Sequence, residues 1–89
     1  MKIFKYRLEL EAFQTIKMKG VIQILDVINQ DGILQLYALV DPTETYEVGV
    51  DVAIVGTGHD ASDELERWTF LRSVKQKVFV WHIFYKVDI

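Results

Sequence analysis

The sequence predicts an all-β fold, a single antiparallel β-sandwich or small barrel of about seven strands with one short helix. Apolar and polar residues alternate with a period of two through most of the chain, as strands with one solvated face require. Turn-forming residues separate these segments at short, regular intervals. Only one short segment favours a helix, so the alternating segments decide the fold class.

Three of the predicted strands are defined by alternation alone. In residues 4–10 the even positions are apolar and the odd positions are charged. A second, shorter strand covers residues 14–18. The cleanest alternation lies in residues 48–54, where every second residue from Val48 to Ile54 is apolar and β-branched, which favours a strand.

A hairpin is predicted between residues 21–28 and residues 33–40. The turn between them contains Asp31 and Gly32, and this pair tolerates the positive φ angles of a tight hairpin. Pro42 ends the second strand because proline has no amide hydrogen and fixes its own φ.

The C-terminal part of the chain predicts a helical turn and a second hairpin. Asp63–Arg67 is the helix candidate, and Ser62 can cap its first turn. Residues 68–74 and 78–87 form the hairpin around Lys75-Gln76-Lys77, and the last strand is apolar on both faces, which is typical of a central strand or of one packed against a partner. The predicted core consists of Phe4, Tyr6, Leu8, Ile16, Ile24, Leu36, Val50, Val52, Ile54, Val80 and Ile83.

Size and composition favour one domain over residues 1–89, in a soluble intracellular protein. A chain of 89 residues is long enough for one core and too short for two. The absence of cysteine excludes disulfides, thiolate metal sites and a cysteine nucleophile. Charged residues interrupt the first seven positions, so they do not form the apolar part of a signal peptide, and no apolar run is long enough for a transmembrane helix.

Charge is segregated along the chain. All ten Lys and Arg residues lie before residue 20 or after residue 66, whereas ten of the thirteen acids lie between these limits. The fold must therefore interleave the segments or present a bipolar surface, and the two alternatives are equally compatible with the sequence. A bipolar surface would favour an anionic ligand on one side or head-to-tail contact between copies.

Several blocks of the sequence resemble a family of small phage- and prophage-encoded β-proteins, a domain of unknown function. The blocks are Lys2-Ile3-Phe4-Lys5-Tyr6, Gln14-Thr15-Ile16, Leu36-Tyr37-Ala38-Leu39-Val40-Asp41-Pro42, Ile54-Val55-Gly56-Thr57-Gly58-His59 and Val80-Trp81-His82-Ile83-Phe84. This chain departs from the family in having Lys19-Gly20-Val21 where a Pro-Lys-Gly turn is usual, and Arg72 where glycine is usual. The resemblance implies a phage accessory protein in the host cytoplasm, and it implies no known active site.

The segment Gly56-Thr57-Gly58-His59 is the first candidate ligand site. Its two glycines would let backbone N–H groups surround an anion. The same residues also suit an ordinary tight turn, since neither a phosphate-loop lysine nor a βαβ pattern accompanies them.

Basic and aromatic residues after this segment extend the candidate site. These residues are Arg67, Trp68, Arg72, Lys75 and Lys77. Aromatic rings beside cations suit a nucleotide or a single strand, whereas the acidic isoelectric point disfavours general binding of double-stranded nucleic acid. Core packing remains the alternative for the aromatic residues.

Neither a metal site nor a catalytic site is predicted. His59 near Asp60, Asp63 and Glu64 is more typical of an exposed polar cap than of a metal centre. His82 is expected to be a core histidine with a backbone partner. No nucleophile elbow, triad spacing or carboxylate pair stands out, and an enzyme would need one of the histidines to meet an acid through folding.

Together with the role that the resemblance implies, these features favour a non-catalytic phage accessory protein that modulates the host, for example in counter-defence, without a cofactor. It would bind and sequester an anionic nucleotide-like small molecule or occupy a host protein. The alternative is a structural or virion-associated β-domain that docks on another phage protein. The apolar last strand and the opposed charges also predict a homo-oligomer.

Overall fold

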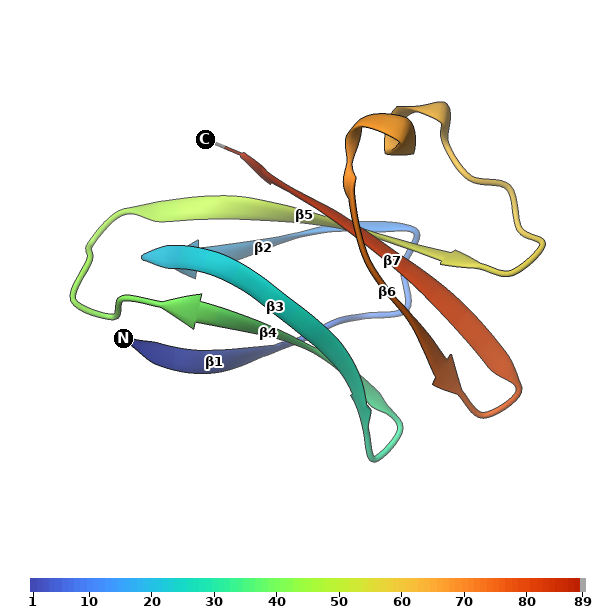
Figure 1. Ribbon diagram of the computed structural model, residues 1–89, viewed down its shortest axis with the longest axis horizontal. Coiled ribbons are helices and arrows are strands. Elements are labelled where there is room, and N and C mark those ends of the chain that lie inside the picture. Colours follow the sequence, from blue (N-terminus) through green and yellow to red (C-terminus); the bar gives the residue numbers. More distant parts are fainter. Residues whose placement is uncertain (89) are drawn as a thin grey trace.

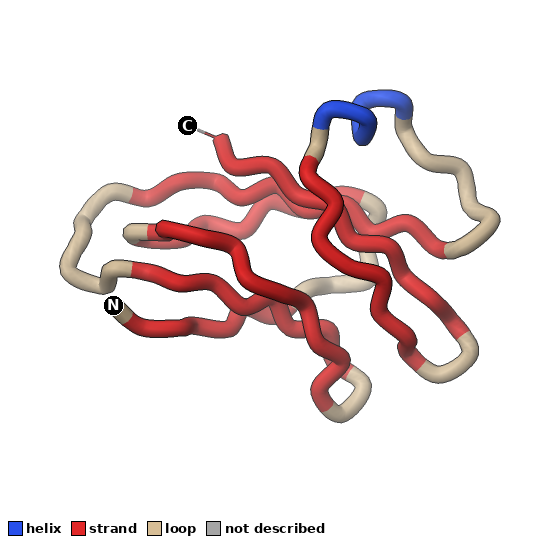
Figure 2. The backbone as a smooth tube through the Cα atoms, in the orientation of Figure 1, coloured by secondary structure: helices blue, strands red, loops and turns tan. Residues whose placement is uncertain are grey.

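The computed structural model describes residues 1–88, and it contains seven strands and one 3₁₀ turn (Figures 1 and 2). The elements are β1 (Lys2–Arg7), β2 (Phe13–Lys19), β3 (Val21–Gln30), β4 (Ile33–Val40), β5 (Glu47–Gly56), η1 (Asp63–Arg67), β6 (Thr69–Gln76) and β7 (Phe79–Asp88). The predicted all-β class, the number of strands and the position of the short helix are confirmed.

The strands form two antiparallel sheets with one core between them. The three-stranded sheet has the order β1-β4-β3, and the four-stranded sheet has the order β2-β5-β7-β6. Strand pairing over residues 1–88 does not close into a barrel, so the arrangement is that of two stacked layers. The last strand lies between β5 and β6, which confirms its expected central position.

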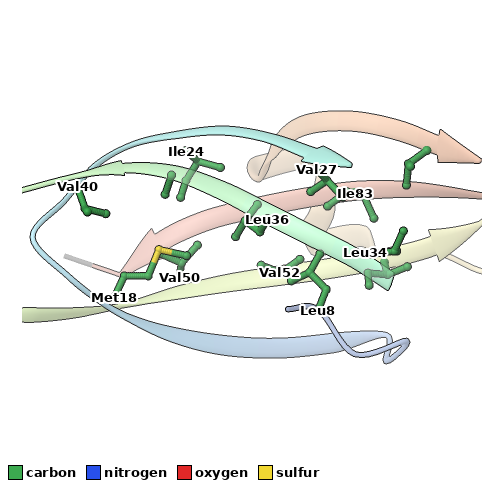
Figure 3. Close-up of a cluster of buried hydrophobic side chains, with 13 residues drawn as sticks. Leu8, Met18, Ile24, Val27, Leu34, Leu36, Val40, Val50, Val52 and Ile83 are labelled. Carbon is green, nitrogen blue, oxygen red and sulfur yellow. The ribbon is translucent and has the colours of Figure 1, made fainter. Parts of the chain in front are cut away.

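The core is built from the inward side chains of both sheets (Figure 3). Of the predicted core residues, seven are buried and two more, Tyr6 and Ile16, pack against them partly buried. Phe4 and Val80 were predicted wrongly, since they are 41% and 36% exposed. Phe4 lies on edge strand β1, and Val80 faces outward because it is an odd number of positions from buried Ile83 in the same strand.

Tight turns connect the hairpins. Asp31 and Gly32 have φ angles of 54° and 86°, which confirms the predicted turn between β3 and β4. In the second hairpin, Lys75 and Gln76 remain paired with β7, so the turn lies one or two residues later than predicted, at Lys77 with φ of 55°. A lysine can adopt this left-handed conformation in a turn at a modest energetic cost.

The fold places basic segments of the chain beside acidic ones. Of the two alternatives that the sequence allowed, interleaved segments and a bipolar surface, the structure shows interleaving. Arg72 on β6 forms an ion pair of 2.5 Å with Asp26 on β3, and this contact joins the two sheets at one side. Lys86 on β7 lies 3.9 Å from Asp51 on the neighbouring strand β5. Bases from the C-terminal flank therefore neutralise acids from the middle of the chain.

Within residues 1–88 there is no helix with the length and apolar character needed to cross a membrane.

Candidate functional site

The glycine-containing segment after β5 forms a tight turn closed by a histidine. The His59 amide donates to the Gly56 carbonyl at 3.0 Å, and Gly58 has a φ of +83°. A Cβ atom at Gly56 would lie 2.6 Å from Nδ1 of His59. The space that glycine leaves at position 56 is therefore occupied by the His59 ring, which accounts for this glycine without a bound anion.

The candidate ligand residues are divided among separate parts of the molecule. Gly56, Thr57 and His59 line one hollow of about 240 Å³. Trp68 lines a different cleft, beside Lys86. Arg72, on β6, forms an ion pair with Asp26 on β3. The remaining candidates are Gly58 in the turn, Arg67 at the end of η1, Lys75 on β6 and Lys77 between β6 and β7.

The segment between Gly58 and Trp68 is acidic. It carries Asp60, Asp63, Glu64 and Glu66 against a single base, Arg67. Ser62 caps η1 through its hydroxyl, and the acids of its first turn are stabilised at the positive end of the helical turn, as predicted. This charge opposes the approach of an anion to the segment that links the glycine turn to Trp68.

His82 is not a core histidine, contrary to the sequence-based expectation. It is half-buried on the outer face of the four-stranded sheet, because it alternates with buried Ile83. Its Nε2 lies 2.7 Å from the Thr57 hydroxyl and its Nδ1 lies 2.7 Å from the Ser73 hydroxyl. A neutral imidazole donates through one nitrogen and accepts through the other, so these two hydroxyls use both positions.

His82 contacts two hydroxyls and His59 contacts an aromatic ring, and Glu11 and Asp60 line the same hollow as His59. In the part of the chain that the structure describes, no three His, Asp or Glu side chains converge to hold a metal ion. The partners of His82 are hydroxyls and the aromatic neighbour of His59 is Trp81.

An aromatic ridge crosses the end of the molecule where the β6–β7 turn lies. We define it as Phe79, Trp81 and His59. Phe79 stacks on Trp81 with ring centroids 5.3 Å apart, and the His59 and Trp81 rings form an edge-to-face pair with centroids 6.3 Å apart. Phe79 is 52% exposed, and the neighbouring apolar residues Val78 and Leu10 are also exposed.

Hollows lie on both sides of the aromatic ridge. One, of about 290 Å³, is lined by Leu10, His59 and Trp81 among others. Another, of about 310 Å³, lies between Phe79, Trp81 and Lys77. Trp81 is partly buried against the core, as the sequence predicted, but sequence reasoning missed this surface because it placed Phe79 on the same packed face. The sequence signal for this surface was the apolar run 78–80 directly after a turn, because the first residues of a strand lie at the end of the sheet.

A second feature, the Trp68 cleft, lies under η1 on the outer face of the four-stranded sheet. It measures about 380 Å³ and is lined by Phe13, Gln14, Thr15, Asp51, Glu64, Trp68 and Lys86. The Phe13 ring meets Trp68 edge to face at 5.9 Å, and Nζ of Lys86 lies 5.3 Å from the centre of the Trp68 ring. The cleft therefore has two aromatic walls.

The floor of the Trp68 cleft is a polar group of side chains. The Thr15 hydroxyl donates to Oδ1 of Asp51 at 2.6 Å. The neighbouring Asp51 carboxylate accepts a hydrogen bond from the protonated Asp88 carboxyl, which raises the pKa of Asp88, and desolvation and the Asp51 charge add to this effect. The residues that form this cleft come from four elements, so sequence proximity gave no indication of it.

The molecule is thus a small all-β domain of two antiparallel sheets, with an exposed aromatic ridge and an aromatic cleft. The chain belongs to the family described as Domain of unknown function (DUF7352), whose model matches residues 1–88. No curated protein and no solved structure matches it.

Proposed function

We propose that this protein is a non-catalytic binding protein that contacts another protein through the aromatic ridge. The observation that carries the proposal is the stacked pair of Phe79 and Trp81, of which Phe79 is half exposed. Aromatic side chains dominate the binding energy of protein interfaces because they bury a large area with little loss of conformational freedom. Contiguous exposed apolar patches often mark protein interaction sites.

The position of the ridge supports this use. The Trp81 ring is held in place by a hydrogen bond from Nε1 to the Gln76 side chain at 2.9 Å, so the surface is ordered before binding. The hollows beside Phe79 and Trp81 can receive side chains of a partner, and Lys77 provides a charge at their rim. Following the resemblance to phage-encoded proteins, the proposed partner is a host protein and the proposed setting is the host cytoplasm.

Replacement of Phe79 by serine tests the proposal. Phe79→Ser is expected to weaken capture of the partner about tenfold or more, because a central aromatic contact contributes at least ~1.4–2 kcal/mol. Phe70→Ser is the matched control, since Phe70 is 53% exposed but lies away from the ridge, in contact with Phe84. Proteins retained by each variant from infected cells are quantified by mass spectrometry, with melting temperatures recorded for both.

The outcome of this comparison also separates the two proposed settings. Host proteins lost only with Phe79→Ser support host modulation, for example in counter-defence. Capsid or tail proteins lost in the same way favour the alternative of a virion-associated domain. Equal retention by the two variants contradicts a binding role for the ridge.

Capture of an anionic nucleotide-like ligand is a second candidate, favoured by one local cluster. Thr57 and Ser73 place hydroxyls on either side of His82, and Lys75 lies two residues after Ser73 on the same face of β6. A ligand at 100 times its Kd would stabilise the protein by about 2.7 kcal/mol and raise its melting temperature by more than about 5 °C.

A thermal-shift screen of cyclic and linear nucleotides checks this second candidate. Lys75→Ala is expected to remove most of the shift, whereas Lys17→Ala, which loses the same charge on a different strand, is expected to retain it. A screen in which no nucleotide changes the melting temperature leaves only the protein-binding form of the proposal.

Self-association remains a prediction with less support than the sequence suggested. The apolar faces of β7 are explained by its central place between β5 and β6. The exposed ridge is one of the apolar surfaces through which copies could make contact. Light scattering at tens of micromolar is expected to show a dimer if copies associate there, and Phe79→Ser is then expected to give a monomer.

A further inference from the structure

The two sides of the molecule differ in how their sheet edges are closed. At one side, β3 and β6 are joined by the Arg72–Asp26 ion pair and by a hydrogen bond of 3.0 Å from the Asn29 side chain to the Lys75 carbonyl. At the other side, β1 and β2 are the terminal strands of their sheets, and neither has a further strand beside it within residues 1–88. The outer edge of β2 is therefore available for main-chain pairing.

The hydrogen bonds of β2 show which of its backbone groups face this open edge. Ile54 donates to the Ala12 carbonyl at 3.1 Å, and Gly20 donates to the Tyr46 carbonyl at 3.2 Å. Antiparallel pairing alternates along a strand, so the even-numbered residues of β2 bond to β5. The N–H and C=O groups that point outward belong to the odd-numbered residues Phe13, Thr15, Lys17 and Lys19.

The side chains of these odd-numbered residues lie on the outer face, because Met18 is buried toward the core. Phe13 and Thr15 line the Trp68 cleft, and Lys17 and Lys19 follow it along the strand. In β5, Gly49 lies opposite Lys17 and Glu47 lies opposite Lys19, whereas β2 itself contains no acid. The open edge thus presents an aromatic cleft followed by two positive charges at alternate positions.

We propose that the β2 edge binds an extended acidic segment of a partner protein as an added antiparallel strand. Main-chain hydrogen bonds to Thr15, Lys17 and Lys19 would supply much of the affinity. An apolar side chain opposite Thr15 would enter the Trp68 cleft, and acidic side chains two and four positions away would face Lys17 and Lys19. This surface is separate from the aromatic ridge and does not depend on its function.

Charge decides between the possible occupants of the edge. Two copies of β2 would bring lysines together without an acid in either strand, and like charges on paired strands are destabilising. Lysines on an edge strand also prevent aggregation through sheet extension. An acidic partner strand would replace the repulsion between lysines by attraction. The lysines that discourage pairing between two copies of β2 would therefore favour an acidic partner.

Binding of a synthetic peptide tests the proposal directly. The probe is the capped peptide Glu-Thr-Glu-Thr-Leu-Thr-Leu, whose glutamates face Lys19 and Lys17 and whose first leucine faces Thr15 in antiparallel pairing. Its affinity at low salt, measured by fluorescence anisotropy, is expected to exceed that of the peptide with both glutamates replaced by lysine by about tenfold or more.

N-methylation of the peptide separates main-chain pairing from charge attraction and leaves the protein unchanged. A methyl group on the amide of the second glutamate removes the hydrogen bond to the Lys17 carbonyl and is expected to abolish detectable binding. The same methyl group on the adjacent threonine points away from β2 and is expected to have little effect. On the protein side, Lys17→Pro is expected to reduce affinity more than Lys17→Ala, because only proline removes the outward N–H group.

Three results would overturn the proposal. Equal affinity for the acidic and basic peptides, or no binding of either, excludes an acidic strand as the occupant of the β2 edge. Equal effects of the two methylated peptides exclude main-chain pairing and leave a general attraction of polyanions, which a single-stranded oligonucleotide with the same affinity would reveal. A wild-type dimer that Lys17→Pro converts to a monomer would make a second copy the occupant.

Discussion

An aspartate at position 52 is expected to unfold the protein. Val52 is fully buried in the middle of β5, and no polar or charged side chain is buried with it in residues 1–88. A carboxylate there would have no hydrogen-bond partner and no counterion. Its burial costs several kcal/mol, against a total stability of about 5–10 kcal/mol for a domain of this size.

The test compares Val52→Asp with the same substitution at an exposed valine. Val78 is 87% exposed in the β6–β7 turn, so Val78→Asp is expected to change stability by less than about 0.5–1 kcal/mol. Thermal melts followed by circular dichroism are expected to show a cooperative transition for Val78→Asp and none for Val52→Asp. A native-like melt of Val52→Asp would contradict the central position of β5.

The strands could be predicted from the sequence because their signal is local. In β4 the residues alternate between half-buried and buried along the whole strand, and the buried ones are the apolar residues from Leu34 to Val40. The turn at Asp31 and Gly32 is also a property of neighbouring residues. Side-chain alternation and turn residues need no knowledge of distant segments.

Strand partners and exposure at the edges could not be predicted in the same way. β1 pairs with β4 and β2 pairs with β5, and each pair is far apart in the sequence. Phe4 has the alternation of a core residue, but it lies on a terminal strand and remains 41% exposed. Alternation identifies which side chains share a face, whereas burial depends on what covers that face.

The candidate site was predicted from closeness in sequence, and the fold separates its members. Arg72 seemed available to a ligand beside Trp68, yet it pairs with Asp26, which is 46 positions away in the chain. The Trp68 cleft instead combines Phe13 from β2 and Lys86 from β7. Contacts of this kind depend on strand order, which the sequence alone left open.

Gly20 carries the second large expected effect, because its backbone makes a close approach that excludes any side chain. It has a φ of +59°, and a Cβ atom there would lie 2.1 Å from the carbonyl oxygen of Asp41. That oxygen also accepts a hydrogen bond from the Glu44 amide at 3.2 Å, and the Asp41 amide donates to the Gly20 carbonyl at 2.8 Å.

The Asp41 carbonyl is held in a turn that cannot readily move away from Gly20. The hydroxyl and amide of Thr43 both donate to the Asp41 carboxylate, at 2.6 Å and 3.0 Å, and they lower the pKa of this group. Gly20→Ala must therefore disrupt this turn as well as force alanine into the left-handed conformation. The combined loss is expected to be about 3 kcal/mol or more, since strained conformations of this kind cost about 1–3 kcal/mol each.

Gly32→Ala provides the matched comparison for Gly20→Ala. Gly32 has a φ of +86°, but no atom lies within 4 Å of the position its Cβ would take. Only the conformational cost of about 1–2 kcal/mol then applies. Because 1 kcal/mol shifts the melting temperature of such a domain by about 4–8 °C, Gly20→Ala is expected to melt well below Gly32→Ala. Equal melting temperatures of the two variants would mean that the turn at Asp41 moves to make room for the new methyl group. The connection between β2 and β3 would then be less rigid than this close approach implies.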